Sequence, residues 1–228
     1  MSQNTNGFRI CSQSDLARIV QEYGFLPLFQ NDIPGFSVEE HTPAEFWFVD
    51  GEDGPWEWKG PVIRQTGCAY GKFFRGKAGF ISAMWYPDFA NYRRDGYDFD
   101  ARYEDGLAAY QDKTVYELLA GYDSLLSGEL KQLGGFGKNG RKGFDTVMTR
   151  LQMQGYVTTA DFEYKRDKQG SPYGWGVARY ATPEHYFGDS FVQQVYQRTP
   201  EQSKERIIRH LSALLPDVQR EKLLKAVG

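Results

Sequence analysis

Two glutamines that flank one apolar residue, in the tripeptide Gln152-Met153-Gln154, are the residues that most directly suggest chemistry. An amide side chain both donates and accepts hydrogen bonds, so it can hold a water molecule or pair with the edge of a nucleic-acid base. If this segment is extended, both amides project from one face, because side chains alternate along a strand. If it is the last turn of a helix, the two amides are ordinary exposed groups. The sequence leaves both interpretations open.

Basic residues gather around these glutamines, although the chain as a whole carries a formal net charge of −3. Residues 131–168 contain eight basic and four acidic side chains, and this local positive excess suits contact with phosphates. The alternative is a solvated helix face followed by a charged hairpin tip. The candidates for DNA contact are Lys138, Arg141, Lys142, Arg150, Lys165, Arg166 and Lys168.

Aromatic residues make up 16% of the chain, which is enough both to fill a core and to line a pocket. Enzymes that act on a base in DNA extrude it and hold it between aromatic or apolar faces. The candidates for such a base pocket are Trp56, Trp58, Trp85 and Tyr86. Core packing is the alternative, and we expect it for at least two of the four.

The sequence indicates no metal site and no cofactor. His41, His185 and His210 are scattered, and Cys11 and Cys68 have no metal-ligand spacing. The acidic residues between 95 and 105 lack the spacing of a calcium loop. Neither a nucleophile elbow nor a phosphate-binding glycine loop is present. We therefore expect any reaction to depend on side chains and water.

The elements that would position the glutamines and the basic residues follow the order of a winged helix-turn-helix. Asp112 is expected to cap a helix over 113–120, and Ser127 a short helix that ends at Gly134. An apolar stripe predicts a third helix over 141–154. A strand then opens at 156–157, and residues 165–174 form a hairpin tip. Helix, turn, helix and hairpin predict a nucleic-acid-facing surface.

We therefore predict an α+β protein in three parts that pack as one compact unit. They are an N-terminal aromatic-rich α/β region over 1–111, a winged helix-turn-helix over 112–183 and C-terminal helices over 184–228. In the first part, residues 69–74 and 79–81 are expected to pair as strands. No apolar run approaches the roughly 20 residues that cross a bilayer, and the first residues lack the apolar core of a signal peptide. We expect a cytoplasmic protein with no membrane partner.

Three segments carry a resemblance to a known family: Asp-Gly-Pro-Trp-Glu-Trp-Lys at 53–59, the expected strand pair at 69–74 and 79–82, and Leu-Gln-Met-Gln at 151–154. Together they resemble the bacterial AlkZ-related proteins, relatives of the AlkZ/YcaQ winged-helix DNA glycosylases, over most of residues 12–198. Those glycosylases excise alkylated purines and unhook interstrand crosslinks. Their signature of glutamine, apolar residue, then glutamine or aspartate positions the attacking water. The resemblance assigns that role to Gln152 and Gln154, with duplex DNA as the partner.

Two departures from the glycosylases are visible, because this chain is much shorter and its glutamine motif comes late rather than near the start. Three functions therefore stay open. The first is a glycosylase that flips a damaged base into an aromatic pocket, where water held by the glutamines attacks the sugar. The second is a winged-helix protein that binds DNA or regulates without catalysis. The third is a protein-interaction module.

Overall fold

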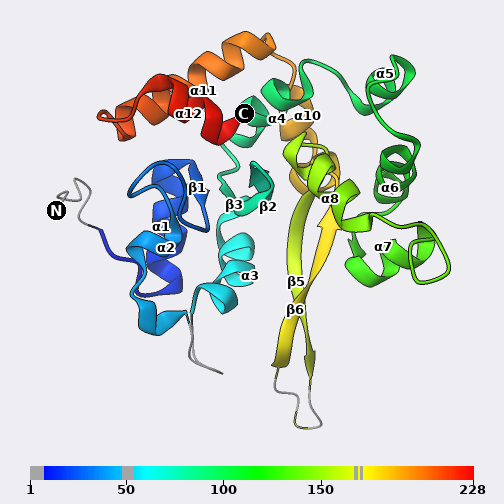
Figure 1. Ribbon diagram of the computed structural model, residues 1–228, viewed down its shortest axis with the longest axis horizontal. Coiled ribbons are helices and arrows are strands. Elements are labelled where there is room, and N and C mark those ends of the chain that lie inside the picture. Colours follow the sequence, from blue (N-terminus) through cyan, green and yellow to red (C-terminus); the bar gives the residue numbers. More distant parts are fainter. Residues whose placement is uncertain (1–7, 48–53, 167–168, 170–171) are drawn as a thin grey trace.

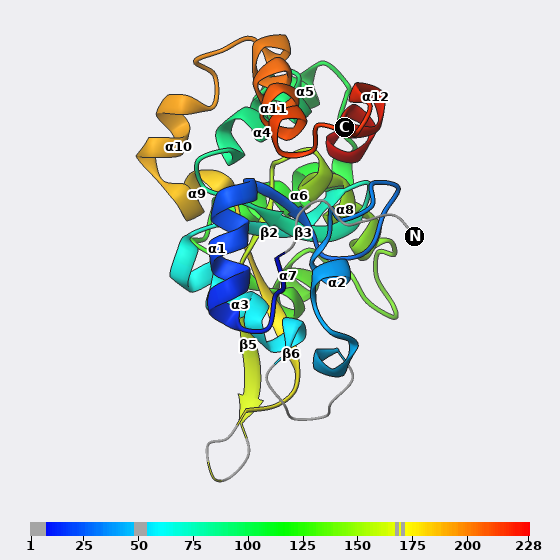
Figure 2. The same ribbon diagram turned by 90° about the vertical axis from the view of Figure 1, so that its left-hand side faces the viewer.

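The computed structural model describes residues 8–47, 54–166, 169 and 172–228, and it has the mixed α+β architecture that the sequence predicts. Within these residues, six strands form one antiparallel sheet in the order β1-β3-β2-β5-β6-β4. The hairpin of β5 and β6 lies between the N-terminal helices on one side and α6 and α7 on the other (Figure 1). In the view turned by 90°, this hairpin again runs away from α11 and α12 (Figure 2).

The N-terminal half supplies three neighbouring strands of the sheet. Its elements are α1 (Gln13–Tyr23), β1 (Phe25–Pro27), α2 (Val38–His41), the 3-10 helix η1 (Ala44–Phe46), α3 (Pro55–Thr66), β2 (Ala69–Phe74), β3 (Lys77–Ile81) and α4 (Tyr86–Arg94). The expected strand pair at 69–74 and 79–81 is confirmed. Its turn is Arg75-Gly76, where both residues have positive φ, as a tight two-residue hairpin turn requires.

The middle of the chain contains the expected order of helix, turn, helix and hairpin. Its elements are α5 (Phe99–Glu104), α6 (Tyr110–Ala120), β4 (Leu125–Leu126), α7 (Ser127–Leu133), α8 (Phe144–Met153), β5 (Thr158–Arg166) and β6 (Pro172–Ala181). The short strand β4 pairs with β6, and β6 pairs with β5, so the segment before α7 is tied to the hairpin.

The expected cap at Asp112, with a helix over 113–120, is wrong, because α6 begins at Tyr110 and its N-cap is Ala109. Asp112 lies in the first turn, and its carboxylate accepts a hydrogen bond from the backbone N–H of Ala109 at 3.2 Å. A carboxylate at the third residue of a helix can accept a hydrogen bond from a free N–H at the helix start. Asp112 therefore acts from inside the first turn and not from the position before the helix.

The C-terminal helices are α9 (Pro183–Phe187), α10 (Asp189–Gln194), α11 (Pro200–Leu214) and α12 (Arg220–Val227). The helix α11 packs against α4, and its buried residues Ile207, Ile208 and Leu211 join the core of the N-terminal half. A second apolar cluster fills the space between α6, α7 and α8, around Val115, Leu151 and residues near them.

The strands of the N-terminal half and those of the middle of the chain belong to one sheet, because Tyr70 of β2 pairs with Thr159 of β5. None of the helices in the described part of the chain is long and apolar enough to cross a membrane.

Candidate functional site

The first of the two glutamines, Gln152, lies in the last turn of α8 and is turned inward, with 2% of its surface exposed. Its side-chain oxygen accepts a hydrogen bond from the backbone N–H of Lys72 at 2.6 Å. The register between β2 and β3 shifts between Gly71 and Phe74, so Lys72 has no paired residue in that ladder. The Gln152 amide therefore supplies the acceptor that the interrupted ladder lacks.

The second glutamine, Gln154, is the residue that ends α8, and its side chain is half-buried. Its side-chain oxygen is fully buried and has no hydrogen-bond partner among the described residues. Buried polar atoms are nearly always paired, and an unpaired one costs about 1–3 kcal/mol, so its presence calls for an explanation such as a bound water or a functional role. The two side-chain oxygens therefore have different surroundings: that of Gln152 is hydrogen-bonded, and that of Gln154 is buried without a partner among the described residues.

Gln154 lines a solvent-open hollow of about 510 Å³ on the exposed side of α8. The hollow is built from three elements that lie far apart in the sequence: β2, α4 and α8. Its lining residues are Lys72, Arg93, Asp145, Thr146, Thr149, Arg150, Met153 and Gln154. We call this the α8 hollow.

Three of the side chains that line the α8 hollow are cationic, and one, Asp145, is acidic and mostly exposed. Lys72 donates from its ammonium group to the hydroxyl of Thr149 at 3.1 Å, which joins β2 to α8 across the hollow. Arg93 donates to the backbone carbonyl of Met153 at 2.8 Å and to that of Gly228. Burial lowers the pKa of Arg93. The hollow thus combines positive charge with the amide side chain of Gln154, whose oxygen is itself buried.

Arg150 differs from the other cations because its guanidinium forms a two-pronged pair with Asp112, at 2.8 and 2.5 Å. The Asp112 side chain is 2% exposed, so this pair fixes α8 against α6. The hydrogen bond and the charge of Asp112 raise the pKa of Arg150 against the effect of burial. A guanidinium held in this way has less freedom to contact a phosphate than an unpaired one.

The other predicted DNA contacts are spread over the loop before α8 and over the hairpin. Lys138 and Lys142 are exposed and form no ion pair among the described residues. Arg141 donates to the hydroxyl of Thr114 at 3.0 Å and lies over the ring of Tyr110. Lys165 and Arg166 belong to β5, but their side chains, like the whole of Lys168, lie outside the described residues.

The four aromatic residues proposed as a base pocket lie in three different surroundings and do not line the α8 hollow. Trp58 and Tyr86 are buried in the N-terminal core, which is the packing role that we expected for at least two of them. Trp56 is half-buried and meets the edge of Trp47 at 5.8 Å between ring centroids. Trp85 is half-buried and stacks on a histidine of α11.

Sequence reasoning missed two residues of the hollow, Lys72 and Arg93, because nothing in the local pattern places either of them beside α8. It also missed Arg94, which is 1% exposed and donates to the carbonyl of Gly155 at 2.8 Å. The carboxylate of Glu184 lies 2.8 Å from Arg94. Burial opposes the charge of Arg94, but Glu184 and Tyr196 more than compensate, so its pKa stays above the usual range. This network fixes the backbone directly after Gln154.

The family comparison agrees with the resemblance seen in the sequence. The model of the family described as AlkZ related matches residues 10–228, which confirms that resemblance. No curated protein and no solved structure matches the chain.

Proposed function

Because the chain belongs to the AlkZ-related family, we propose that it binds DNA through a winged helix-turn-helix and hydrolyses the N-glycosidic bond of a damaged base. The observation that carries this proposal is the α8 hollow, which is lined by cations and by the side chain of Gln154, whose buried oxygen has no partner among the described residues. Cations suit the phosphates of a nucleotide, and an unpaired acceptor suits a water molecule.

The order α6, β4, α7, α8, β5 and β6, with β4 paired to β6, supports the winged-helix assignment. In helix-turn-helix proteins the second helix of the motif lies in the major groove, and here that helix is α8. The β5–β6 hairpin is then the wing. The α8 hollow lies on the exposed side of the same helix, so DNA held by α8 would be beside it.

In the proposed reaction, Lys72 and Lys142 contact phosphates while a damaged nucleotide turns out of the duplex toward the hollow. With its side chain turned so that the buried oxygen reaches the hollow, Gln154 accepts a hydrogen bond from a water molecule and orients the water oxygen toward the sugar carbon C1′. The C–O bond forms as the C–N bond breaks, and the base leaves with the bonding electron pair. An N-alkylated purine is cationic, so it departs neutral, and the water loses its proton to solvent.

Gln152 has a different part in this proposal. Its oxygen already accepts from the backbone of Lys72, so it acts as a positioning residue that holds β2 beside α8. Because this hydrogen bond holds β2 in place, the side chain of Lys72 is kept at the hollow.

DNA binding is tested by fluorescence anisotropy with a labelled duplex at several salt concentrations. The affinity should fall as salt rises, and Lys72→Ala or Lys142→Ala should each reduce the salt slope by about 1, since each removes one phosphate contact. Lys204→Ala is the matched control, because Lys204 lies on α11 and pairs with Glu201. A protein without salt-dependent affinity for duplex DNA would contradict the whole proposal.

Catalysis is tested by measuring base release from a duplex that contains an alkylated purine. Gln154→Ala should lower the rate about a hundredfold or more while the DNA affinity stays unchanged, because the amide orients the water and binds no phosphate. Gln132→Ala, which removes an exposed amide from α7, is the matched control. Full activity in Gln154→Ala would contradict the assigned role.

A DNA-binding protein without catalysis is the second candidate, and the burial of Gln152 favours it. One of the two amides of the signature is 2% exposed and engaged with the backbone, so it cannot reach a substrate in this arrangement. This candidate predicts the same salt-dependent DNA affinity with no release of any alkylated base by the wild-type protein.

A further inference from the structure

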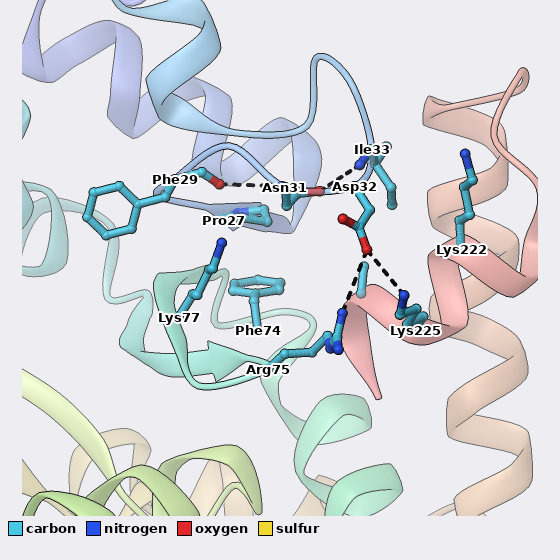
Figure 3. A pocket seen from close by; sticks show the side chains of 11 residues that line it. Pro27, Phe29, Asn31, Asp32, Ile33, Phe74, Arg75, Lys77, Lys222 and Lys225 are labelled. Carbon is cyan, nitrogen blue, oxygen red and sulfur yellow. Dashed lines mark hydrogen bonds and ion pairs between the residues drawn. The ribbon is translucent and has the colours of Figure 1, made fainter.

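A second cavity, of about 530 Å³, lies beside the β2–β3 hairpin, between this hairpin, the loop after β1 and the helix α12 (Figure 3). The three elements come from the beginning, the first half and the end of the chain. Its charged and aromatic lining includes Asp32, Phe74, Arg75, Lys77, Lys222 and Lys225. We call this the α12 cavity.

The α12 cavity has four cationic side chains and one acidic side chain in its lining. The carboxylate of Asp32 points at two of the cations (Figure 3): one oxygen lies 3.7 Å from the guanidinium of Arg75 and 3.3 Å from the ammonium group of Lys225. The hydrogen bond and charge of Lys225 hold the pKa of Asp32 below its usual value. Cations from the hairpin and from α12 therefore converge on one oxyanion.

Positive charge is left over after this pairing. Lys222 forms no ion pair within the described part of the chain, and the ammonium group of Lys77 donates to the backbone carbonyl of Gln30 at 3.5 Å. Four cations and one carboxylate in the lining leave an excess of positive charge that an anion with more than one negative charge would balance. A phosphate monoester carries close to two such charges near neutral pH.

Apart from Asn31, the remaining lining of the α12 cavity is apolar, with Pro27, Phe29, Ile33, Phe74 and Ala226. The Phe74 ring lies against the backbone of β3, where a Cβ at Gly79 would be 2.4 Å from a ring carbon. The absence of a side chain at Gly79 therefore leaves room for the Phe74 ring. Figure 3 shows the ring of Phe74 between Lys77 and Arg75, so an apolar face and cations are adjacent.

We propose that the α12 cavity binds a mononucleotide, with its phosphate beside Arg75 and Lys225 and its base against Phe74 and Pro27. The shared chemistry is a phosphate monoester on a flat ring, either as a free nucleotide or at the 5′ end of a DNA strand. The cavity has the volume usual for sites that take small organic ligands. It shares no lining residue with the α8 hollow, so this proposal does not depend on the proposed DNA glycosylase activity.

The test is isothermal titration calorimetry on the full chain with adenosine 5′-monophosphate, adenosine, inorganic phosphate and a 5′-phosphorylated tetranucleotide. The monophosphate should bind with at least about tenfold higher affinity than adenosine or phosphate, because only it uses both the cations and the apolar wall. The tetranucleotide distinguishes the source: the free nucleotide is the ligand if it binds more tightly, and a strand end is the ligand if the tetranucleotide does.

Three substitutions connect the binding to this cavity. Lys225→Ala and Arg75→Asn should each lower the affinity for the monophosphate by about fivefold or more, since each removes a charge-assisted contact. Asparagine is chosen because residue 75 has a φ of 53°, which asparagine tolerates. Asp32→Asn should strengthen binding, because it removes the carboxylate that competes for both cations. Lys204→Ala is the control, and a thermal melt of each variant verifies folding.

The proposal is overturned if neither the monophosphate nor the tetranucleotide binds at millimolar concentration. It is also overturned if inorganic phosphate binds as tightly as the monophosphate, or if folded Lys225→Ala binds as well as the wild type. Failure of base release or of duplex binding in the earlier assays leaves these outcomes unaffected, because they concern other residues.

Discussion

The substitution Gln152→Leu tests whether this glutamine supports the structure. Its side-chain oxygen lies 2.6 Å from the backbone nitrogen of Lys72, and 2% of the residue is exposed. Leucine has a similar volume and no polar atom, so the packing of α8 should be kept while the acceptor is lost. The N–H of Lys72 would then have no acceptor from α8.

The magnitude follows from two contributions. A net hydrogen bond contributes about 1 kcal/mol, and a partly buried N–H without a partner costs about 1 kcal/mol more. The free energy of unfolding should therefore fall by about 2 kcal/mol, which for a chain of this length lowers the melting temperature by about 4–8 °C. Gln132→Leu, at an exposed site on α7, should stay within about 0.5 kcal/mol of the wild type.

Urea unfolding followed by circular dichroism gives the free energy, and amide hydrogen exchange gives the local effect. The N–H of Lys72 should exchange faster in Gln152→Leu than in the wild type, because its acceptor is gone. If the variant is as stable as the wild type and the N–H of Lys72 stays protected, the positioning role is wrong. A loss of base release without any loss of stability would instead assign Gln152 to the reaction.

Three further predictions concern the rest of the molecule. Burial raises the pKa of Cys68 to about 12, so a thiol reagent at mildly alkaline pH should label only the exposed Cys11 until the protein is denatured; labelling of Cys68 in the folded protein would contradict this. Burial lowers the pKa of His210 below the ordinary value of 6.5, so the folded state binds fewer protons than the unfolded state. Its stabilising contribution is present above that value and is lost as the pH falls through the folded pKa, and thermal melts of His210→Gln should show a weaker pH dependence than the wild type. Asp112→Asn should lower the free energy of unfolding by about 1 kcal/mol, a value reduced because Arg150 is more than a third exposed; unchanged stability in urea would show that the pair contributes nothing.

The expected helices and strands follow from short-range rules, and much of the fold was predictable for that reason. The apolar stripe of Phe144, Val147 and Leu151 specifies α8, and the strands around Arg75-Gly76 follow from alternation and a turn. At Asp112, the rule for helix starts allowed two positions for the first residue of α6, and the one that we expected is wrong. A carboxylate can satisfy a helix start from the capping position or from the third residue, and composition does not distinguish the two.

The family and the two amides of Gln152 and Gln154 were determined by the sequence alone, since both are properties of residue order. Only the tertiary structure decided what each amide meets. Gln152 and its partner Lys72 are 80 residues apart, and the place of β2 beside α8 depends on packing across the whole sheet. The same holds for Arg93 in the α8 hollow and for Lys225 in the α12 cavity. Side-chain periodicity fixes which face of an element is apolar, but which other element covers that face is a long-range outcome that no local pattern records.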